Sequence, residues 1–202
     1  MSAEQILTQD FGTLADVIRE QAKDLGAQAA LVDANRTISY AELDELMDRI
    51  AVALQRDGVQ TADVAAVCAT TSAEYGATFF GILRAGAIVA PLAPSSTADS
   101  LVMMLKDCGA KVFFLDAGVA KQLEGVAGQI TAKRVALDGS PAGVAFEEWL
   151  APKGSKPTPV TIDPDQGFNI IYSSSACWPA PRPQSARRSR ARARSTRPVT
   201  AR

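Results

Sequence analysis

Apolar positions alternate between two spacings along most of the chain. Short apolar runs of four to six residues are separated by longer stretches in which apolar residues recur every three or four positions. Short runs of this kind are typical of buried strands, and the longer stretches are typical of helices with one apolar face. The alternation predicts an α/β fold whose parallel sheet is covered by helices on both faces. The strands are expected at 64–69, 88–92, 111–115, 134–137 and 168–172.

The N-terminal part of the chain precedes this alternation. A first helix is expected to begin at Thr13 and to end at Gly26, since glycine commonly terminates helices. Residues 29–32 and 36–39 are strand-like and flank an Asp-Ala-Asn turn, so they predict a short hairpin. The apolar face of the first helix would consist of Leu14, Val17, Ile18 and Leu25.

A capping box marks the start of the second helix. In the segment from Ser39 to Glu42, the serine oxygen can accept a backbone N–H of the first turn while the glutamate reaches back. This helix is expected to end near Gly58. Its buried face would be Leu43, Leu46, Met47, Ile50 and Leu54. Later helices are expected at 72–84, 97–107, 119–126 and 144–150.

Several charged and glycine-containing patterns favour a structural role. Asp44, Glu45 and Asp48 are expected on the solvent-exposed face of the second helix, where they would be solvated charges and not an acid–base pair. Gly81 and Gly86 have the outer spacing of a phosphate loop, but no Lys-Ser pair follows them. A helix C-terminus is therefore the better interpretation of this pair.

The absent and scattered residue types exclude several classes of chemistry. The chain contains no histidine, which excludes Ser-His-Asp, Cys-His and His–metal sites. Cys68, Cys108 and Cys177 form no CxxC pair, so free thiols are expected in place of a disulfide framework or a zinc site. No apolar run reaches the ~20 residues of a membrane span. We therefore expect a cytoplasmic protein without a membrane segment or metal ligands.

The C-terminal segment differs in character from the rest of the chain. Residues 176–202 hold eight of the 21 basic residues, all arginine, and none of the 22 acidic ones. They form no apolar face, so we expect this tail to be disordered. Arginine, alanine, proline and serine are also what an out-of-frame reading of a GC-rich gene yields, which is the favoured interpretation. The alternative is a genuine arm that binds nucleic acid or an acidic membrane.

Three segments together resemble the adenylate-forming (AMP-binding) superfamily, which includes acyl-CoA synthetases. Residues 37–58, TISYAELDELMDRIAVALQRDG, resemble the family's early T-Y-x-E-L helix. Residues 80–114, containing LRAGAIVAPLAP and later DCGAK, resemble its L-K-A-G-A-x-x-x-P-L-x-P strand and the helix that ends in D-x-G-A-K. Residues 162–174, IDPDQGFNIIYSS, resemble the approach to its phosphate loop. The resemblance covers about residues 11–174.

The resemblance implies a domain organisation. Residues 11–150 would form the flavodoxin-like first subdomain of the enzyme's N-terminal domain. Residues 151–166, with four prolines, would be a surface linker. Residues 167–175 would be a strand and the start of the phosphate loop, followed by the tail at 176–202.

The resemblance also implies a chemistry. The intact family uses ATP and Mg to adenylate a carboxylic acid and then transfers the acyl group to a thiol, commonly coenzyme A. Ser173 and Ser174 match the first two hydroxyl residues of its phosphate loop, Y-[ST]-S-G-[ST]-T-G-x-P-K-G. Ser175 then replaces the first glycine, a bulky Ala-Cys-Trp-Pro segment follows, and no lysine occurs after Lys156. No catalytic residue is assigned, and this chain is expected to be a truncated, inactive ligase that binds no ATP.

Two other interpretations remain open from the sequence. In one, the chain is a non-catalytic α/β protein whose arginine-rich tail binds nucleic acid. In the other, it is an α/β regulatory or interaction module that retains the scaffold without binding ATP.

Overall fold

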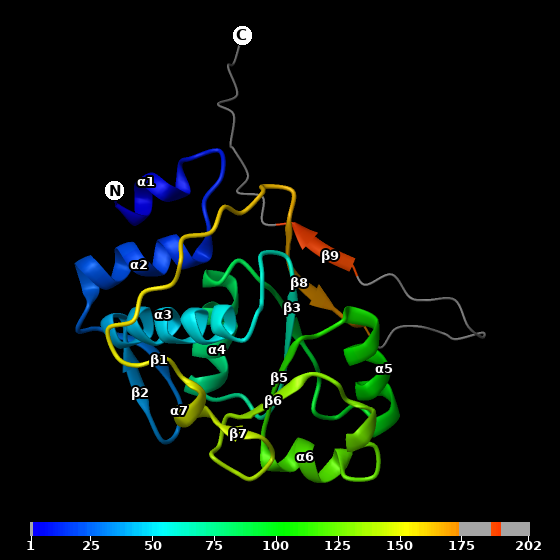
Figure 1. The fold of residues 1–202 in the computed structure, drawn as a ribbon. Coiled ribbons are helices and arrows are strands. Elements are labelled where there is room, and N and C mark those ends of the chain that lie inside the picture. Colours follow the sequence, from blue (N-terminus) through cyan, green and yellow to red (C-terminus); the bar gives the residue numbers. More distant parts are fainter. Residues whose placement is uncertain (1, 174–186, 191–202) are drawn as a thin grey trace.

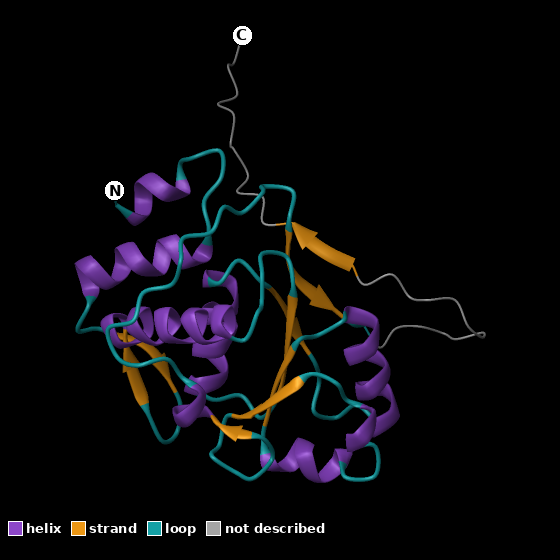
Figure 2. Cartoon of the chain, in the orientation of Figure 1, coloured by secondary structure: helices purple, strands orange, loops and turns teal. Residues whose placement is uncertain are grey.

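The computed structural model describes residues 2–173 and, for the backbone, residues 187–190. The strands form a small N-terminal hairpin and a larger seven-stranded sheet (Figures 1 and 2). The strands are β1 (Ala29–Val32), β2 (Thr37–Ser39), β3 (Val64–Cys68), β4 (Ile88–Pro91), β5 (Val112–Leu115), β6 (Lys133–Ala136), β7 (Val144–Ala145), β8 (Gly167–Ile171) and β9 (Arg187–Arg190). The helices are α1 (Ala3–Leu7), α2 (Leu14–Leu25), α3 (Tyr40–Arg56), α4 (Ala73–Arg84), α5 (Ala98–Cys108), α6 (Ala117–Leu123) and α7 (Phe146–Trp149), with a 3-10 turn at Ala127–Gln129.

The strand order of the large sheet confirms the predicted fold class. The order is β7-β6-β5-β3-β4-β8-β9, and the six strands from β7 to β8 are parallel to one another. Counted from β3, the first five strands follow the flavodoxin-like order 2-1-3-4-5. The chain then returns from β7, at the far edge, to place β8 beside β4.

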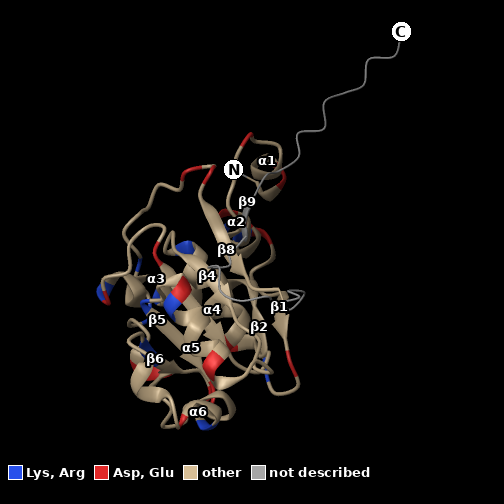
Figure 3. Ribbon diagram, turned by 90° about the vertical axis from the view of Figure 1, so that its right-hand side faces the viewer, with Lys and Arg blue, Asp and Glu red and all other residues tan. Residues whose placement is uncertain are grey.

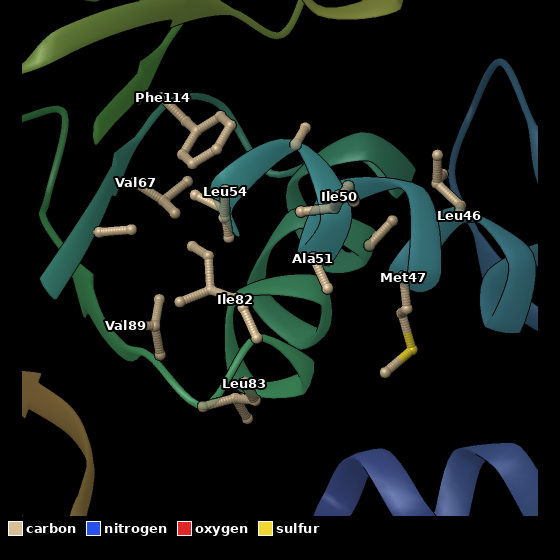
Figure 4. Close-up of a cluster of buried hydrophobic side chains, with 14 of the residues drawn as sticks. Leu46, Met47, Ile50, Ala51, Leu54, Val67, Ile82, Leu83, Val89 and Phe114 are labelled. Carbon is tan, nitrogen blue, oxygen red and sulfur yellow. The ribbon is translucent and has the colours of Figure 1, made fainter. Parts of the chain in front are cut away.

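Helices cover both faces of the sheet, as expected from the strands' continuous apolar character. One face packs against α3 and α4, with α2 packed on these two helices, and Figure 4 shows side chains of α3 and α4 meeting those of the sheet. The other face packs against α5 and α6. Phe113 and Phe114 point to opposite faces and are both fully buried, which fits a strand covered on both sides.

Side-chain caps explain why the main helices begin where they do. The predicted capping box is present, because Ser39 accepts the N–H of Glu42 and the glutamate bonds back to the N–H of Ser39. Side chains cap five further helices, each accepting the backbone N–H three residues on: Ser2, Thr13, Ser72, Thr97 and Asp116. At the other end of α4, Gly86 has φ +76°, which confirms that Gly81 and Gly86 belong to a helix terminus.

Two local predictions were wrong. Leu14 was expected on the buried face of α2, but it is 47% exposed, and Ala15 and Ile18 are the buried residues of that helix. The segment 144–150 was expected to be a single helix. Its first two residues instead pair with β6 as β7, and only Phe146–Trp149 is helical. The edge of a sheet offered Val144 hydrogen-bonding partners that its own sequence does not reveal.

The prediction that Asp48 is a solvated surface charge was also wrong. Its side chain is 2% exposed and accepts a hydrogen bond from Arg84 Nη1 at 2.9 Å. The other guanidinium nitrogen, Nη2, lies 2.7 Å from Asp44 Oδ1 and donates to the carbonyl of Ala15. Arg84 comes from α4, so a partner on a different helix allows Asp48 to be buried as a charge.

The segment 151–166 is a loop that crosses α3 and carries the chain back towards β8 (Figure 1, yellow to orange). Lys156 Nζ lies 2.7 Å from Asp48 Oδ2, and Gln55 both donates to and accepts from the backbone of Thr158. Further on, Gln166 donates to the carbonyl of Gly86. These contacts fasten the crossing segment to α3 and to the turn before β4.

Four residues of the arginine-rich tail are described. The backbone of β9 pairs antiparallel with β8, so the structure gives these four residues a strand in place of the disorder that the sequence predicts. The rest of that predicted disordered tail, and Cys177 with it, lies outside the described residues. Within the described part, no helix is long and apolar enough to cross a membrane.

Replacing Asp48 tests the importance of the buried ion pair. We expect Asp48→Ala to lower the free energy of unfolding by about 3 kcal/mol or more, because Arg84 would keep only one of its two carboxylate partners in a buried position. Urea unfolding at pH 7 would measure the change. The control is Glu45→Ala, which removes an acid from a partly exposed position of the same helix and should cost under about 0.5 kcal/mol. An equal loss of unfolding free energy in the two variants would contradict the importance of the buried Asp48–Arg84 ion pair.

Candidate functional site

Residues with hydroxyl groups follow three strands and lie at one edge of the sheet. They follow β3 (70–72), β4 (95–97) and β8 (Ser173), which are neighbours in the strand order. Because these strands are parallel, their carboxyl ends lie at the same edge, where open α/β sheets bind their ligands. The sequence analysis predicted a site only after β8. The residues after β3 and β4 also follow short apolar strands, and this shared position could have indicated them.

One hydroxyl group of each of the first two turns is used within the fold. Ser72 Oγ accepts the backbone N–H of Tyr75 at 3.1 Å. Thr97 Oγ1 accepts the N–H of Ser100 at 3.3 Å and donates to the hydroxyl of the same serine. These residues therefore act as helix caps for α4 and α5.

A carboxylate occupies the point where the strand order reverses, between β3 and β5. Asp116 follows β5, and its Oδ2 accepts the N–H of Thr70 at 2.7 Å while its Oδ1 accepts the N–H of Val119 at 2.9 Å. Burial raises the pKa of Asp116, but the two backbone N–H donors outweigh that effect and hold the pKa below its ordinary value. In this fold the reversal point commonly binds an anion, and here the anion is supplied by the chain itself.

The exit of β8 is fixed by a tyrosine. Tyr172 donates its hydroxyl hydrogen bond to Asp107 Oδ2 at 2.7 Å, and the same oxygen lies 3.2 Å from the carbonyl oxygen of Met104. Burial, and then the bond to Asp107, raise the pKa of Tyr172. The predicted site residue Ser173 comes next and is exposed, whereas Ser174 lies outside the described residues. The structure thus places the first of the two predicted serines at the carboxyl edge of the sheet.

Several backbone N–H groups that a nucleoside triphosphate site could use are bonded within the fold. Such a site needs free N–H donors and positive charge. At this edge the N–H groups of Thr70 and Val119 are already bonded to Asp116, and Asp138, which follows β6, bonds the N–H of Ala117. The charged groups that act at these strand ends are therefore carboxylates. Among the described residues, no group of three or more His, Cys, Asp or Glu side chains could hold a metal ion.

Comparison with known proteins identifies the family. The profile of the AMP-binding enzyme family matches residues 18–176, so the chain belongs to this family. A 3-hydroxybenzoate–CoA/4-hydroxybenzoate–CoA ligase of Thauera aromatica is 29% identical over 179 residues, or 85% of this chain. A linear gramicidin synthase of Brevibacillus parabrevis is 28% identical over 153 residues, or 76% of this chain. The chain's predicted relationship to adenylate-forming enzymes is confirmed.

Solved structures show the same fold. An anthranilate CoA ligase in complex with anthranoyl-AMP aligns with a TM-score of 0.75 over 86% of this chain, at 20% identity. A putative long-chain-fatty-acid CoA ligase of Rhodopseudomonas palustris aligns with a TM-score of 0.70 over 82% of this chain, at 25% identity.

The chain spans only part of each relative. It covers 34% of the hydroxybenzoate–CoA ligase and 3% of the gramicidin synthase. Of the two aligned structures it covers 33% and 42%. The matched part corresponds to the N-terminal domain of adenylate-forming enzymes.

The carboxylate of Asp116 should make a pH-dependent contribution to the free energy of unfolding. We expect Asp116→Asn to lower the free energy of unfolding by about 1–2 kcal/mol at pH 7, because the amide replaces a charged acceptor of two backbone N–H bonds. The folded-state pKa of Asp116 is lowered, so its stabilisation is present above its unfolded pKa and is lost as the pH falls through the folded value.

The difference between Asp116→Asn and the unchanged chain should therefore shrink below about pH 4. Urea unfolding at a series of pH values would measure it. Asp99→Asn is the matched control, since Asp99 is an exposed acid in the first turn of α5. A difference that is constant between pH 3 and pH 7 would show that Asp116 does not act through its charge.

Proposed function

We propose that residues 11–174 are the first part of an ATP-dependent acid–thiol ligase of the acyl-CoA synthetase type. The complete enzyme would adenylate a carboxylic acid and transfer the acyl group to coenzyme A. The observation that carries this proposal is the parallel strand β8, which emerges beside β4 and leads through Tyr172 into Ser173 at the carboxyl edge of a sheet of this family. The hydroxybenzoate–CoA ligase and the anthranilate CoA ligase support it as relatives in sequence and in fold.

We propose further that the 202-residue chain does not catalyse this reaction by itself. Ser175 stands in place of the glycine that would let the backbone approach a phosphate closely. Pro179 has no N–H to donate, and Trp178 is bulky. Since the edge of the sheet offers carboxylates and bonded N–H groups, nothing described compensates for the missing glycines and lysine. The role of ATP and Mg is therefore assigned to the complete family enzyme.

We also propose a cytoplasmic location. Cys68 and Cys108 are free thiols, and burial raises the pKa of Cys68 to about 12, which makes its thiol unreactive at neutral pH. Free cysteines of this kind are usual for proteins in reducing compartments.

A pyrophosphate-exchange assay tests the proposed inactivity. The panel would contain benzoate, 3- and 4-hydroxybenzoate, anthranilate and fatty acids of several lengths. We expect the 202-residue chain to give no exchange above the background for any acid, because the residues after Ser174 cannot form the phosphate loop. Clear turnover with any of these acids would overturn the proposal.

A pair of chimeras tests whether the scaffold is competent. In the first, residues 1–174 replace the matching part of the Thauera aromatica hydroxybenzoate–CoA ligase, whose own phosphate loop follows. We expect this chimera to exchange pyrophosphate. The second is identical but retains 175–179 of this chain, and we expect at least about 100-fold less exchange, as when a set of positioned oxyanion donors is lost. A first chimera that is folded by circular dichroism yet inactive would argue against a ligase scaffold.

A further inference from the structure

A second candidate site lies at the opposite end of the strands from Ser173. An open cavity of about 460 Å³ is lined by α2, the end of α4, the crossing segment and Asp48 of α3. Arg84, on its wall, comes before β4, and Ile162, also on its wall, comes before β8. The cavity therefore faces the amino ends of these strands. Its volume is in the range of small-molecule binding sites.

The cavity presents positively charged side chains to a ligand. Three cations, from α2, α4 and the crossing segment, share the carboxylate of Asp48: Arg84 at 2.9 Å, Lys156 at 2.7 Å and Arg19 at 3.6 Å. The side chains of Arg84 and Asp48 are each only 2% exposed, whereas those of Lys156 and Arg19 are 72% and 43% exposed. Asp48 also lines the cavity, but its side chain is almost fully covered, so a molecule that enters would meet mainly the exposed cations Lys156 and Arg19.

The other acids near the cavity do not cancel this charge. Asp44 is not on the wall, and its Oδ1 lies 2.7 Å from the buried Arg84. Asp16 is on the wall, but it belongs to the first turn of α2, where the partial positive charge of the helix N-terminus offsets part of the charge of a carboxylate. Its Oδ2 accepts a hydrogen bond from Thr13. The charges around α3 and α4 are of both signs (Figure 3). The exposed charges on the cavity wall are mainly positive, because Lys156 and Arg19 are the exposed cations there.

Most of the remaining wall is apolar, apart from Thr13 and Thr158. Its larger apolar residues are Phe11, Leu83, Pro157, Pro159, Val160 and Ile162. An inorganic anion would leave this surface unused, whereas a molecule with an apolar body and one anionic group would contact both parts.

We propose that this cavity binds a small organic anion, a carboxylate or a phosphate ester, through Lys156 and Arg19. The proposal goes beyond the ligase function and does not depend on it. The ligand would neutralise the excess charge around Asp48 and would hold the crossing segment against α2. Binding should therefore raise the thermal stability of the chain and slow amide hydrogen exchange in residues 156–162.

Calorimetric titration of the 202-residue chain with benzoate, phenyl phosphate and neutral benzamide, at constant ionic strength, tests the proposal. We expect saturable binding of benzoate or phenyl phosphate with a Kd on the order of 1 mM, and no binding of benzamide. The stronger of the two anions identifies the anionic group that the site prefers. Absence of saturable binding for both anions, or equal binding of benzamide, would overturn the proposal.

Matched variants assign the binding to this cavity. Lys156→Ala and Arg19→Ala should each weaken binding about five- to tenfold, because each removes one exposed cation from the wall. Lys153→Ala makes the same change of charge at an exposed position of the same segment outside the cavity, and it should leave the Kd unchanged. Circular dichroism would check that all three variants are folded. If Lys153→Ala weakened binding as much as Lys156→Ala, the anion would be attracted by overall charge and the proposed site would be refuted.

Discussion

One buried carboxylate connects four parts of the chain that are far apart in sequence. Asp48 lies on α3 and is bonded to Arg84 on α4, to Lys156 on the crossing segment and, at longer range, to Arg19 on α2. Arg84 extends the connection by donating to the carbonyl of Ala15 on α2. A buried ion cluster of this kind contributes little net energy compared with a well-packed apolar one, but it penalises any arrangement in which a partner is missing. It therefore specifies how the three helices and the crossing segment fit together.

That arrangement determines where β8 can lie. The chain leaves the sheet at β7, on one edge, and must return to β4 on the other side of the central strand. Lys156 and the paired contacts of Gln55 with Thr158 hold the route against α3, and Gln166 fastens its end to the turn before β4. Once β8 is placed beside β4, Tyr172 bonds Asp107 and brings Ser173 to the carboxyl edge. The position of the proposed phosphate-loop remnant is thus a consequence of contacts made at the other end of the strands.

Much of this fold could be predicted from local patterns. The capping box at Ser39 and the glycine after α4 are signals within a few residues, and apolar periodicity alone located the five central strands to within about two residues. The predictions that were wrong concern residues whose environment is set by parts of the chain distant in sequence. Asp48 has the polar identity and helical position of a surface residue, and its burial depends on cations distant in sequence, chiefly Arg84, which is 36 residues away. Leu14 is apolar but begins its helix at a position that the rest of the fold leaves half exposed.

The candidate site was predicted in part for the same reason. Ser173 follows a recognisable strand, so its place at the edge could be inferred. The role of Asp116 could not, because its acceptance of the Thr70 N–H joins β5 to the turn after β3, and nothing near either residue in sequence indicates the pairing. The serines and threonines after β3 and β4 did not indicate a site either, because capping serines and threonines are common before helices.

Because Asp116 occupies the point between β3 and β5 where the strand order reverses, it limits where an anion could bind in this fold. A flavodoxin-like sheet offers two places at its carboxyl edge: the crevice between β3 and β5, and any loop that follows another strand there. In this chain Asp116 fills the first with its own charge, and a second anion beside it would be repelled. Phosphate binding would then depend wholly on the loop that begins at Ser173. The proposed loss of ligase activity is accordingly attributed to the residues that follow Ser174, while the sheet that positions them is intact.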